Sequence, residues 1–317
     1  MRQSEIIKYY SRPEIAREIT RLASSRETIC QYGLNRVGKR PDVIEMPGDV
    51  AKLARLGATS FHTSEEIWDD PLKLSAESTA REMDDLRAGW DLVIDIDSPN
   101  VKYGKIVAKI ILQAFEYHGL KNASLKFSGN KGMHIGVSFK ALPKEIRGDA
   151  IEKVFPDAPR VVAEYLGEFI RSHLSEAILK QIGDMAQIVK DTGKSRSDLL
   201  VIGKDGWEFD PYKIIELDTI LIAPRHLFRM PYSLHEKSWL SSIVLSPDEI
   251  EAFDRDHDAA PHNVKEVRDW FLNPDRIEEG EATQLVVQAF DWKKKEVKEE
   301  EDITHKIEFD GEIDESA

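Results

Sequence analysis

The segment Asp91–Asp97 constrains the fold of this chain more than any other stretch of its sequence. Its residues alternate between an apolar set and a set that carries three acids: Leu92, Ile94 and Ile96 against Asp91, Val93, Asp95 and Asp97. Side chains two apart on a strand point to the same face, so the pattern predicts a strand with one buried face. Asp95 and Asp97 would then project together, roughly 6.5 Å apart at Cα. That spacing suits two carboxylates that share a pair of divalent cations about 4 Å apart. The alternative is an ordinary solvated strand face that carries two acids.

The segments that follow predict an α/β core. Ser98-Pro99-Asn100 closes the strand and opens a helix that Gly119 ends. A continuous apolar stripe marks the buried side of that helix: Ile106, Val107, Ile110, Ile111, Ala114 and Phe115. Two more strands, Ala123–Phe127 and Met133–Phe139, come next. The order strand, helix, strand, strand is typical of a sheet flanked by helices.

The rest of the chain gives a coarser pattern. Residues 5–24 predict a helix that Pro13 interrupts, and residues 25–70 predict short strands and loops. Residues 143–195 predict a helical insertion subdomain, residues 210–245 return to strands, and residues 247–272 predict helix again. After Trp292 a run of lysines leads into acids, which is typical of a linker or disordered tail. We therefore expect a catalytic core over 1–292 and a charged tail over 293–317.

A second motif joins the two central hairpin strands: Ser128-Gly129-Asn130-Lys131-Gly132-Met133-His134. A turn with two glycines and a hydroxyl can present backbone N–H groups to an anion, and Lys131 adds a positive charge. His134 falls on the polar side of its strand by the alternation of the strand. The competing interpretation is a plain hairpin turn followed by a histidine that is satisfied within the core.

A third motif lies further along the chain. Asp218 follows Leu217, and the segment Arg229-Met230-Pro231-Tyr232-Ser233-Leu234-His235 comes shortly after. Arg229 and His235 are side chains that bind phosphate oxygens, and Asp218 could be a third metal ligand. Taken alone, the segment is equally consistent with an ordinary strand and turn.

Together the three motifs resemble the small catalytic subunit of the archaeal-eukaryotic primase superfamily. That family shows an acid-x-acid strand, then a Ser-Gly-x-x-Gly-x-His hairpin, then a third acid followed by an Arg/Lys-x-Pro-x-Ser-x-His segment. The matches here are Asp95-Ile96-Asp97, Ser128–His134, and Asp218 with Arg229–His235. Tyr9-Tyr10 and Arg26-Glu27 also resemble the opening segments of the family, and the likeness covers residues 5–270.

The resemblance implies a palm-like primase-polymerase core and a role for each matching residue. Asp95, Asp97 and Asp218 would be the catalytic acids that hold two divalent metal ions, Mg²⁺ or Mn²⁺. The residues implied to bind the nucleotide are Ser128, Gly129, Lys131, His134, Arg229 and His235. Arg26 and Glu27 are implied to help seat the initiating nucleotide. The spacing from Asp218 to His235 needs a one-residue gap to align with the family.

The activity implied is that of a DNA primase, a nucleotidyltransferase that synthesises short primers on a single-stranded DNA template from NTPs or dNTPs. The same residues would serve a related primase-polymerase in plasmid replication, repair or defence. A third hypothesis is a non-catalytic nucleic-acid-binding module on the same fold, against which the three acids argue. Partners implied by the resemblance are a primase large subunit or a C-terminal iron–sulfur domain, within a primosome.

Composition narrows these hypotheses. With Cys30 as its one cysteine, the chain cannot carry the zinc knuckle found in many small subunits, and a reducing cytoplasm is the expected compartment. No apolar run approaches the ~18 residues of a membrane span. The net charge of −14 argues against nucleic acid, but residues 296–317 hold ten acids and two bases and so carry −8 of it. The rest of the chain is far less acidic.

Overall fold

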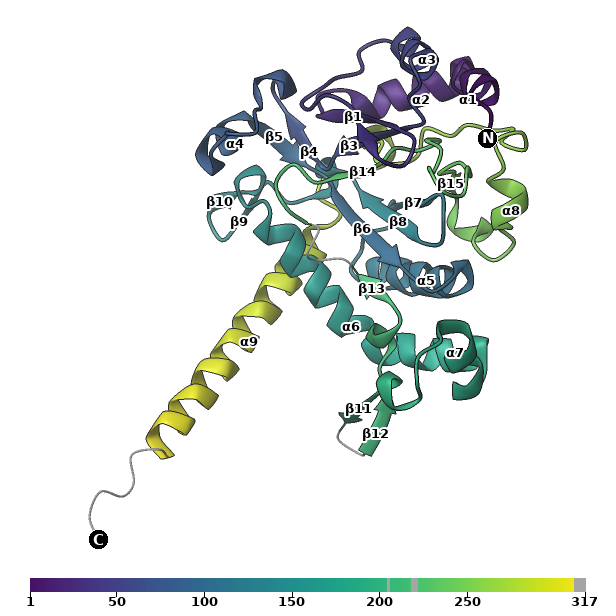
Figure 1. Ribbon diagram of the computed structural model, residues 1–317. Helices are drawn as coiled ribbons and strands as arrows, with labels where there is room; N and C mark the ends of the chain where they lie inside the picture. Colours follow the sequence, from purple (N-terminus) through teal and green to yellow (C-terminus); the bar gives the residue numbers. More distant parts are fainter. Residues whose placement is uncertain (204–205, 218–221, 311–317) are drawn as a thin grey trace.

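The computed structural model describes residues 1–203, 206–217 and 222–310, without the side chains of 297–310 (Figure 1). The fold is a mixed α/β fold, which confirms the class predicted from the sequence. A five-stranded antiparallel sheet occupies its centre in the order β13-β6-β8-β7-β15. Its strands are β6 (Leu92–Asp97), β7 (Ser124–Phe127), β8 (Met133–Val137), β13 (Glu216–Leu217) and β15 (Val244–Leu245).

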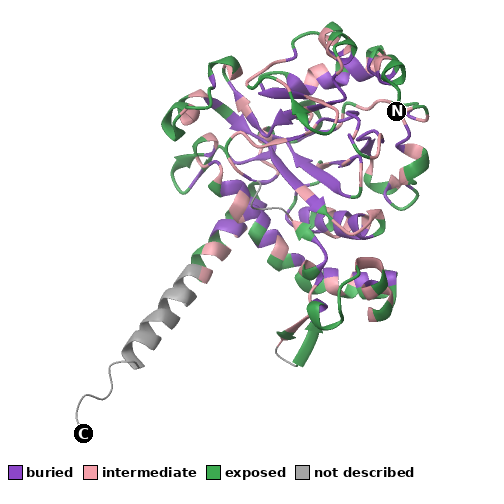
Figure 2. Cartoon of the chain, viewed as in Figure 1, coloured by how far each residue is buried: buried purple, intermediate pink, exposed green. Residues whose placement is uncertain are grey.

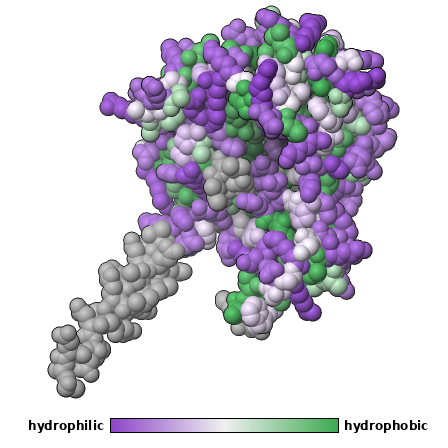
Figure 3. All heavy atoms as spheres, viewed as in Figure 1, coloured by the Kyte–Doolittle hydropathy of each residue, from purple (hydrophilic) through white to green (hydrophobic). Residues whose placement is uncertain are grey.

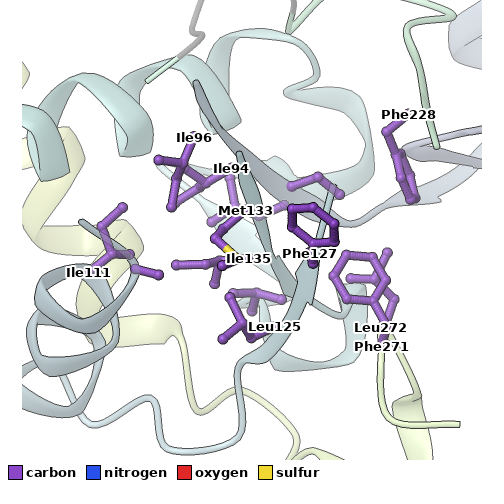
Figure 4. Close-up of a cluster of buried hydrophobic side chains, with 14 of the residues drawn as sticks. Ile94, Ile96, Ile111, Leu125, Phe127, Met133, Ile135, Phe228, Phe271 and Leu272 are labelled. Atoms are coloured by element: carbon purple, nitrogen blue, oxygen red, sulfur yellow. The ribbon is translucent and has the colours of Figure 1, made fainter. Parts of the chain in front are cut away.

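Helix α5 (Val101–Tyr117) covers the apolar face of this sheet and begins where the sequence predicts. The Asn100 side chain accepts the Lys102 N–H at 3.0 Å and caps the helix. Figure 4 shows Ile111 of α5 on one side of the central strands and Phe228, Phe271 and Leu272 on the other. The central sheet is therefore buried between two apolar layers.

Strand β6 departs from the prediction of one buried face. Asp91 and Val93 lie on the face opposite Ile94, yet they are 1% and 3% exposed. Segment 271–272 closes over that face, and a Cβ at Gly136 would stand 2.6 Å from Leu272 Cδ2, so only glycine allows this approach. The second face opens only towards the end of β6, at Asp95 and Asp97.

A second sheet lies beside the first, in the order β14-β3-β1-β2. Its strands are β1 (Thr28–Tyr32), β2 (Arg36–Val37), β3 (Ser60–Ser64) and β14 (Leu227–Arg229). The predicted break at Pro13 is confirmed, because α1 (Gln3–Tyr10) ends before it and α2 (Pro13–Ala23) starts on it. Helix α3 (Pro47–Arg55) lies in a region expected to hold only strands and loops. Pro47 at its first position and the Asp49 carboxylate, which accepts the Met46 N–H, explain why it forms.

The remaining elements surround these two sheets. Residues 143–195 are largely helical, with α6 (Asp157–Ile182) and α7 (Met185–Thr192), preceded by the strand pair β9 (Glu145–Ile146) and β10 (Asp149–Ala150). A hairpin of β11 (Leu200–Gly203) and β12 (Gly206–Phe209) projects beyond α7 (Figure 1). Strands β4 (Glu66–Trp68) and β5 (Arg87–Trp90), with α4 (Ala80–Leu86), complete the opposite side. The division into a core with an inserted subdomain remains a prediction.

The helix predicted over 247–272 is wrong. This stretch holds one short α-helix, α8 (Arg255–Asp258), and a single 3-10 turn (Pro247–Glu249), in otherwise irregular backbone. The Asp254 side chain accepts the N–H groups of Asp256 and His257 and closes that single turn. Ile250, Phe253, Val264 and Phe271 are all buried, so apolar residues reach the core from loops here, and their spacing imitates a helical stripe. The burial pattern along the chain is shown in Figure 2.

Helix α9 (Thr283–Asp310) runs without interruption across the predicted core boundary at residue 292. Its first turns are buried against the body through Leu285, Val286, Ala289 and Phe290, as Figure 2 also shows. The role of the charged tail remains a prediction. In the described part of the chain, no helix is both long enough and apolar enough to cross a membrane.

Candidate active site

Three polar side chains form a row across the central sheet where its second face opens. Asp95 of β6 is paired in register with His134 of β8, and His134 is paired with Lys126 of β7. Residues directly opposite in antiparallel strands share a face, so the three project to the same side. Lys126 Nζ lies 3.0 Å from His134 Nδ1, and His134 Nε2 lies 3.4 Å from Asp95 Oδ1. The row thus runs from a fully buried amine to a carboxylate that is 35% exposed.

Burial disfavours the charged forms of Lys126 and His134, the two buried members of this row. Burial, with Arg229 as the next cause, lowers the pKa of Lys126 well below its usual value. Burial and then the Lys126 amine lower the pKa of His134 well below 6.5, so the imidazole is neutral at pH 7. The Ser242 hydroxyl donates to the Phe127 carbonyl at 2.6 Å and therefore accepts from Lys126 at 2.9 Å. We assign the His134 proton to Nε2, because Lys126 donates to Nδ1 and Nε2 faces the Asp95 carboxylate.

Asp97 lies two residues beyond Asp95 on the same face and is exposed. Glu216 of β13 is paired in register with Asp97, which brings a further carboxylate to this edge of the sheet. Asp218, the predicted third metal ligand, lies outside the described residues. Within the described ranges no group of three or more His, Cys, Asp or Glu side chains is gathered closely enough to hold a metal ion. Asp95 and Asp97 nevertheless form an oxygen-only donor pair of the kind that hard divalent cations prefer.

The glycine turn between β7 and β8 is held by its own serine. Ser128 Oγ accepts the Gly132 N–H at 3.1 Å and the Asn130 N–H at 3.5 Å. Because both lone pairs of that oxygen are used, its proton is left for an acceptor outside the turn. A Cβ at Gly132 would clash with the Ile96 carbonyl, so the turn can lie against the end of β6 only with glycine there. The turn and the two acids are therefore neighbours, and Lys131 within it is exposed.

A loop from residue 235 to residue 240 presses on the same turn. A Cβ at Gly129, which has φ +100°, would stand 2.9 Å from His235 Cβ, and the Ser238 hydroxyl donates to the Gly129 carbonyl. His235 Nδ1 accepts the N–H groups of Lys237 and Ser238 at 3.2 and 3.3 Å. Burial and then the charge of Arg229 lower the pKa of His235 to about 4. The ring is therefore neutral at pH 7, with its proton on Nε2 as a hydrogen-bond donor.

Arg229 of β14 is engaged by a partner that the sequence reasoning did not identify. Its guanidinium forms a two-pronged ion pair with Glu236 at 2.7 and 3.0 Å and donates to the Leu234 carbonyl at 2.7 Å. Burial raises the pKa of Glu236, but the bonds and charge of Arg229 outweigh it and lower that pKa to about 2. The Ser60 hydroxyl also donates to Glu236. Arg229 is thus a fixed cation beside His235 and His134, and it holds its own loop in place.

Arg26 and Glu27, the pair implied to act in initiation, have internal partners. Arg26 is 5% exposed and donates to the Ser64 and Glu65 carbonyls, at 3.0 and 2.9 Å, and to Asp91. The Glu27 carboxylate is fully buried and receives the guanidinium groups of Arg40 and Arg225. The structure thus gives both residues bonds that organise the second sheet, and their role in initiation stays untested.

Four polar residues of this region were missed by sequence reasoning: Lys126, His62, Glu65 and Glu236. Alternation within β7 places Lys126 on the polar face between Leu125 and Phe127, so it could have been found. His62 is paired in register with Arg229 on the neighbouring strand of the second sheet, a relation that no local pattern indicates. The Glu65 Oε2 atom is buried without a hydrogen-bond partner in the described part of the chain. Burial, followed by Glu66, Asp95 and Asp91, raises the pKa of Glu65 well above its usual value.

Comparisons with known proteins add little to this geometry. No family model matches the chain. A segment of 86 residues, 27% of this chain, is 36% identical to an uncharacterized protein from Methanocaldococcus jannaschii, and it spans only 19% of the length of that relative. Among solved structures, the polymerase domain of ligase D from Mycobacterium tuberculosis in complex with DNA is similar, with 13% identity and a TM-score of 0.49, over 78% of this chain and 82% of that one. A similarity at this level does not decide function, which has to come from the residues of the chain itself.

Proposed function

We propose that this chain is a template-directed, metal-dependent nucleotidyltransferase of the primase-polymerase type. The observation that carries the proposal is the meeting of two features at one edge of the central sheet. One is the carboxylate pair Asp95 and Asp97, on the face that opens at the end of β6. The other is the glycine turn 128–132, which lies directly against that strand end. Nucleotidyl transfer needs this combination of acids for cations and donors for phosphates.

The donor set fits divalent cations by its chemistry. Two carboxylates on one strand face, with Glu216 registered beside them, offer the hard oxygen ligands that Mg²⁺ and Mn²⁺ prefer. Bound there, such ions would activate a 3′-hydroxyl for attack on the α-phosphate and neutralise the departing pyrophosphate. Asp95 and Asp97 would be the ligands, joined by Asp218 in the proposal. In the structure His134 Nε2 faces the Asp95 carboxylate at 3.4 Å from within the sheet.

The phosphate-binding side of the proposal uses neutral donors and fixed cations. The Ser128 hydroxyl and the Nε2–H of His235 each have a proton available for a phosphate oxygen, and both border the turn. Lys131 adds an exposed positive charge. Arg229 contributes its charge while it remains bound to Glu236, so it stabilises the triphosphate electrostatically rather than through a free guanidinium fork. His134 supports the same phosphates or Asp95, according to which one its Nε2–H reaches.

We further propose that the reaction is primer synthesis on single-stranded DNA, as in a DNA primase. This finer step rests on the resemblance of the three motifs to primase small subunits. A large subunit or an iron–sulfur domain would be a partner in that case. Arg26 and Glu27 enter the proposal only as supports of the second sheet, because their bonds are internal.

The test measures incorporation of labelled NTPs and dNTPs on unprimed and primed single-stranded DNA, with Mg²⁺, Mn²⁺ or EDTA. We expect incorporation that depends on the cation and disappears in Asp95→Ala and Asp97→Ala. Product from the unprimed template identifies a primase, whereas product only from the primed template identifies an extending polymerase. If the chain binds single-stranded DNA but incorporates no nucleotide under any condition, the proposal is wrong and the hypothesis of a non-catalytic binding module is correct.

A further inference from the structure

A cavity of about 680 Å³ is lined in part by Trp239, which belongs to the same 235–240 loop that contacts the glycine turn. Its other lining residues come from the N-terminal segment that includes α1 and from the chain just after α8, two elements that Figure 1 labels. Aromatic and apolar side chains line one part of it, namely Tyr9, Trp239 and Pro261. Two cationic side chains, Lys8 and Arg12, line it together with His262. Its volume falls in the range of sites that hold a small organic group.

Trp239 is placed in this cavity by a strained backbone. Its φ of +60° lies in the left-handed region, which a bulky side chain rarely occupies. The Trp239 N–H closes the turn by donating to the His235 carbonyl at 2.9 Å. The same loop therefore directs His235 and Ser238 towards the glycine turn and the Trp239 ring towards the cavity. A ligand in the cavity would touch the loop that seats the proposed phosphate site.

The walls of the cavity are fixed before any ligand arrives. The Tyr9 hydroxyl donates to the Tyr232 carbonyl at 2.9 Å and lies 2.6 Å from Ser241 Oγ, which ties α1 to this part of the chain. Arg12 donates to the Val264 carbonyl at 2.6 Å and pairs with Glu14 at 2.8 Å, so its guanidinium is held at the rim. Lys8 is exposed there. Glu5, the acid at this rim, is paired with Arg2 at 2.8 Å.

We propose that this cavity binds one nucleotide unit of single-stranded nucleic acid, with the base against Trp239 and the adjacent phosphates near Lys8, Arg12 and His262. An aromatic surface beside fixed cations is the arrangement that holds single strands without sequence preference. The choice of ligand rests on the proposed function, because the cavity borders the loop of a nucleotidyl-transfer site. The chain as a whole carries a net charge of −14, so the cationic side chains at the rim of this cavity would direct a polyanion to this place.

The experiment measures binding of fluorescein-labelled dT20 to the full chain by anisotropy, in EDTA and without nucleotides, so that no catalysis is required. We expect Trp239→Ala to weaken binding by about 5- to 100-fold and Trp239→Phe to keep most of the affinity. Lys8→Ala should reduce the slope of log affinity against log salt by about 0.7. The matched controls are Trp207→Ala, an exposed tryptophan on the β11–β12 hairpin, and Lys144→Ala, an exposed lysine that pairs with Glu279.

Each outcome decides the inference separately from the proposed function. Equal losses in Trp239→Ala and Trp207→Ala, wild-type binding in Trp239→Ala, or no dT20 binding by the wild-type chain would each overturn it. If Trp239→Ala unfolds, an unchanged salt slope in Lys8→Ala overturns it instead. If the wild-type chain incorporates no nucleotide but the Trp239 and Lys8 variants bind dT20 as expected, the proposed function is wrong, and this site belongs to a protein that binds nucleic acid without catalysis.

Discussion

Two aspartates on the same face have different surroundings: Asp91 immediately before the start of β6, and Asp95 near its end. Asp91 is 1% exposed, pairs with Arg26 and accepts the Phe139 N–H at 2.7 Å. Asp95, four residues later, is 35% exposed on its side chain and faces His134. The residue type and the strand face are identical, so neither decides the role. What differs is the cover, because segments from other parts of the chain close over Asp91 and stop before Asp95.

The largest expected difference between Asp91 and the exposed acids Asp95 and Asp97 is in the catalytic rate. We expect Asp97→Ala and Asp95→Ala each to lower the incorporation rate by about a thousandfold or more, since each removes a ligand for the cations that supply the chemistry. Their urea unfolding midpoints should stay near wild type, because both side chains are partly exposed. A variant shown folded by circular dichroism that retains more than about a tenth of the rate contradicts the assignment.

A substitution at Asp91 should change the stability of the fold and not the catalytic rate. Asp91→Ala leaves the Arg26 guanidinium buried without its carboxylate, which costs about 3–5 kcal/mol in the free energy of unfolding. Urea denaturation measures this directly. The fraction that remains folded should incorporate nucleotide at the wild-type rate. A stable Asp91→Ala protein with no activity would mean that both ends of the strand serve the chemistry.

His134 tests whether the row across the sheet serves the nucleotide. We expect His134→Ala to raise the apparent nucleotide KM by about 10- to 100-fold, through loss of a polar contact to phosphate or to Asp95. His118 is the matched control, because it is a buried histidine bonded to the Ala114 carbonyl and Tyr165 on the far side of the sheet. His118→Ala should lower stability and leave KM unchanged. Equal KM effects in both variants would remove His134 from the site.

Glu65, whose carbonyl accepts the Asp91 N–H at 3.0 Å, gives a pH-dependent prediction. Its folded pKa is raised above the unfolded value, so the folded state binds the proton more tightly, and stability present at low pH is lost as pH rises from about 4.5 towards the folded pKa. Glu65→Gln cannot ionise and should gain on wild type by up to about 1.4 kcal/mol per pH unit in that window. Urea midpoints at pH 5 and pH 7 measure the difference. If wild type and Glu65→Gln differ in the free energy of unfolding by the same amount at pH 5 and pH 7, Glu65 ionises normally.

The smallest effect is expected from the tail. Deleting residues 296–317 should leave the incorporation rate within about twofold of wild type, because that segment is rich in acids that repel the phosphate backbone. Binding of dT20 should be unchanged or slightly tighter. A collapse of the rate with the fold preserved would place the boundary of the catalytic core beyond residue 292.

Local pattern alone predicted the strand at Asp95, the helix after Asn100, the hairpin with its glycine turn and the break at Pro13. Each of these depends on a period of two, a period of 3.6 or a single stereochemical rule, and such signals are complete within a few residues. The same rules placed His134 on the polar face of its strand. They failed over 247–272, because buried apolar residues in a loop can have helical spacing without helical backbone.

What only the tertiary structure decided is which polar groups meet and which are closed off. The bond from Lys126 to His134, the ion pair of Arg229 with Glu236 and the ion pair of Asp91 with Arg26 all join side chains that no helical or strand period relates. A sequence states the side chain and its local direction, but the dielectric and the partners of an ionisable group come from whatever packs against it. For that reason two aspartates on one face of one strand became an internal ion pair and a candidate metal ligand.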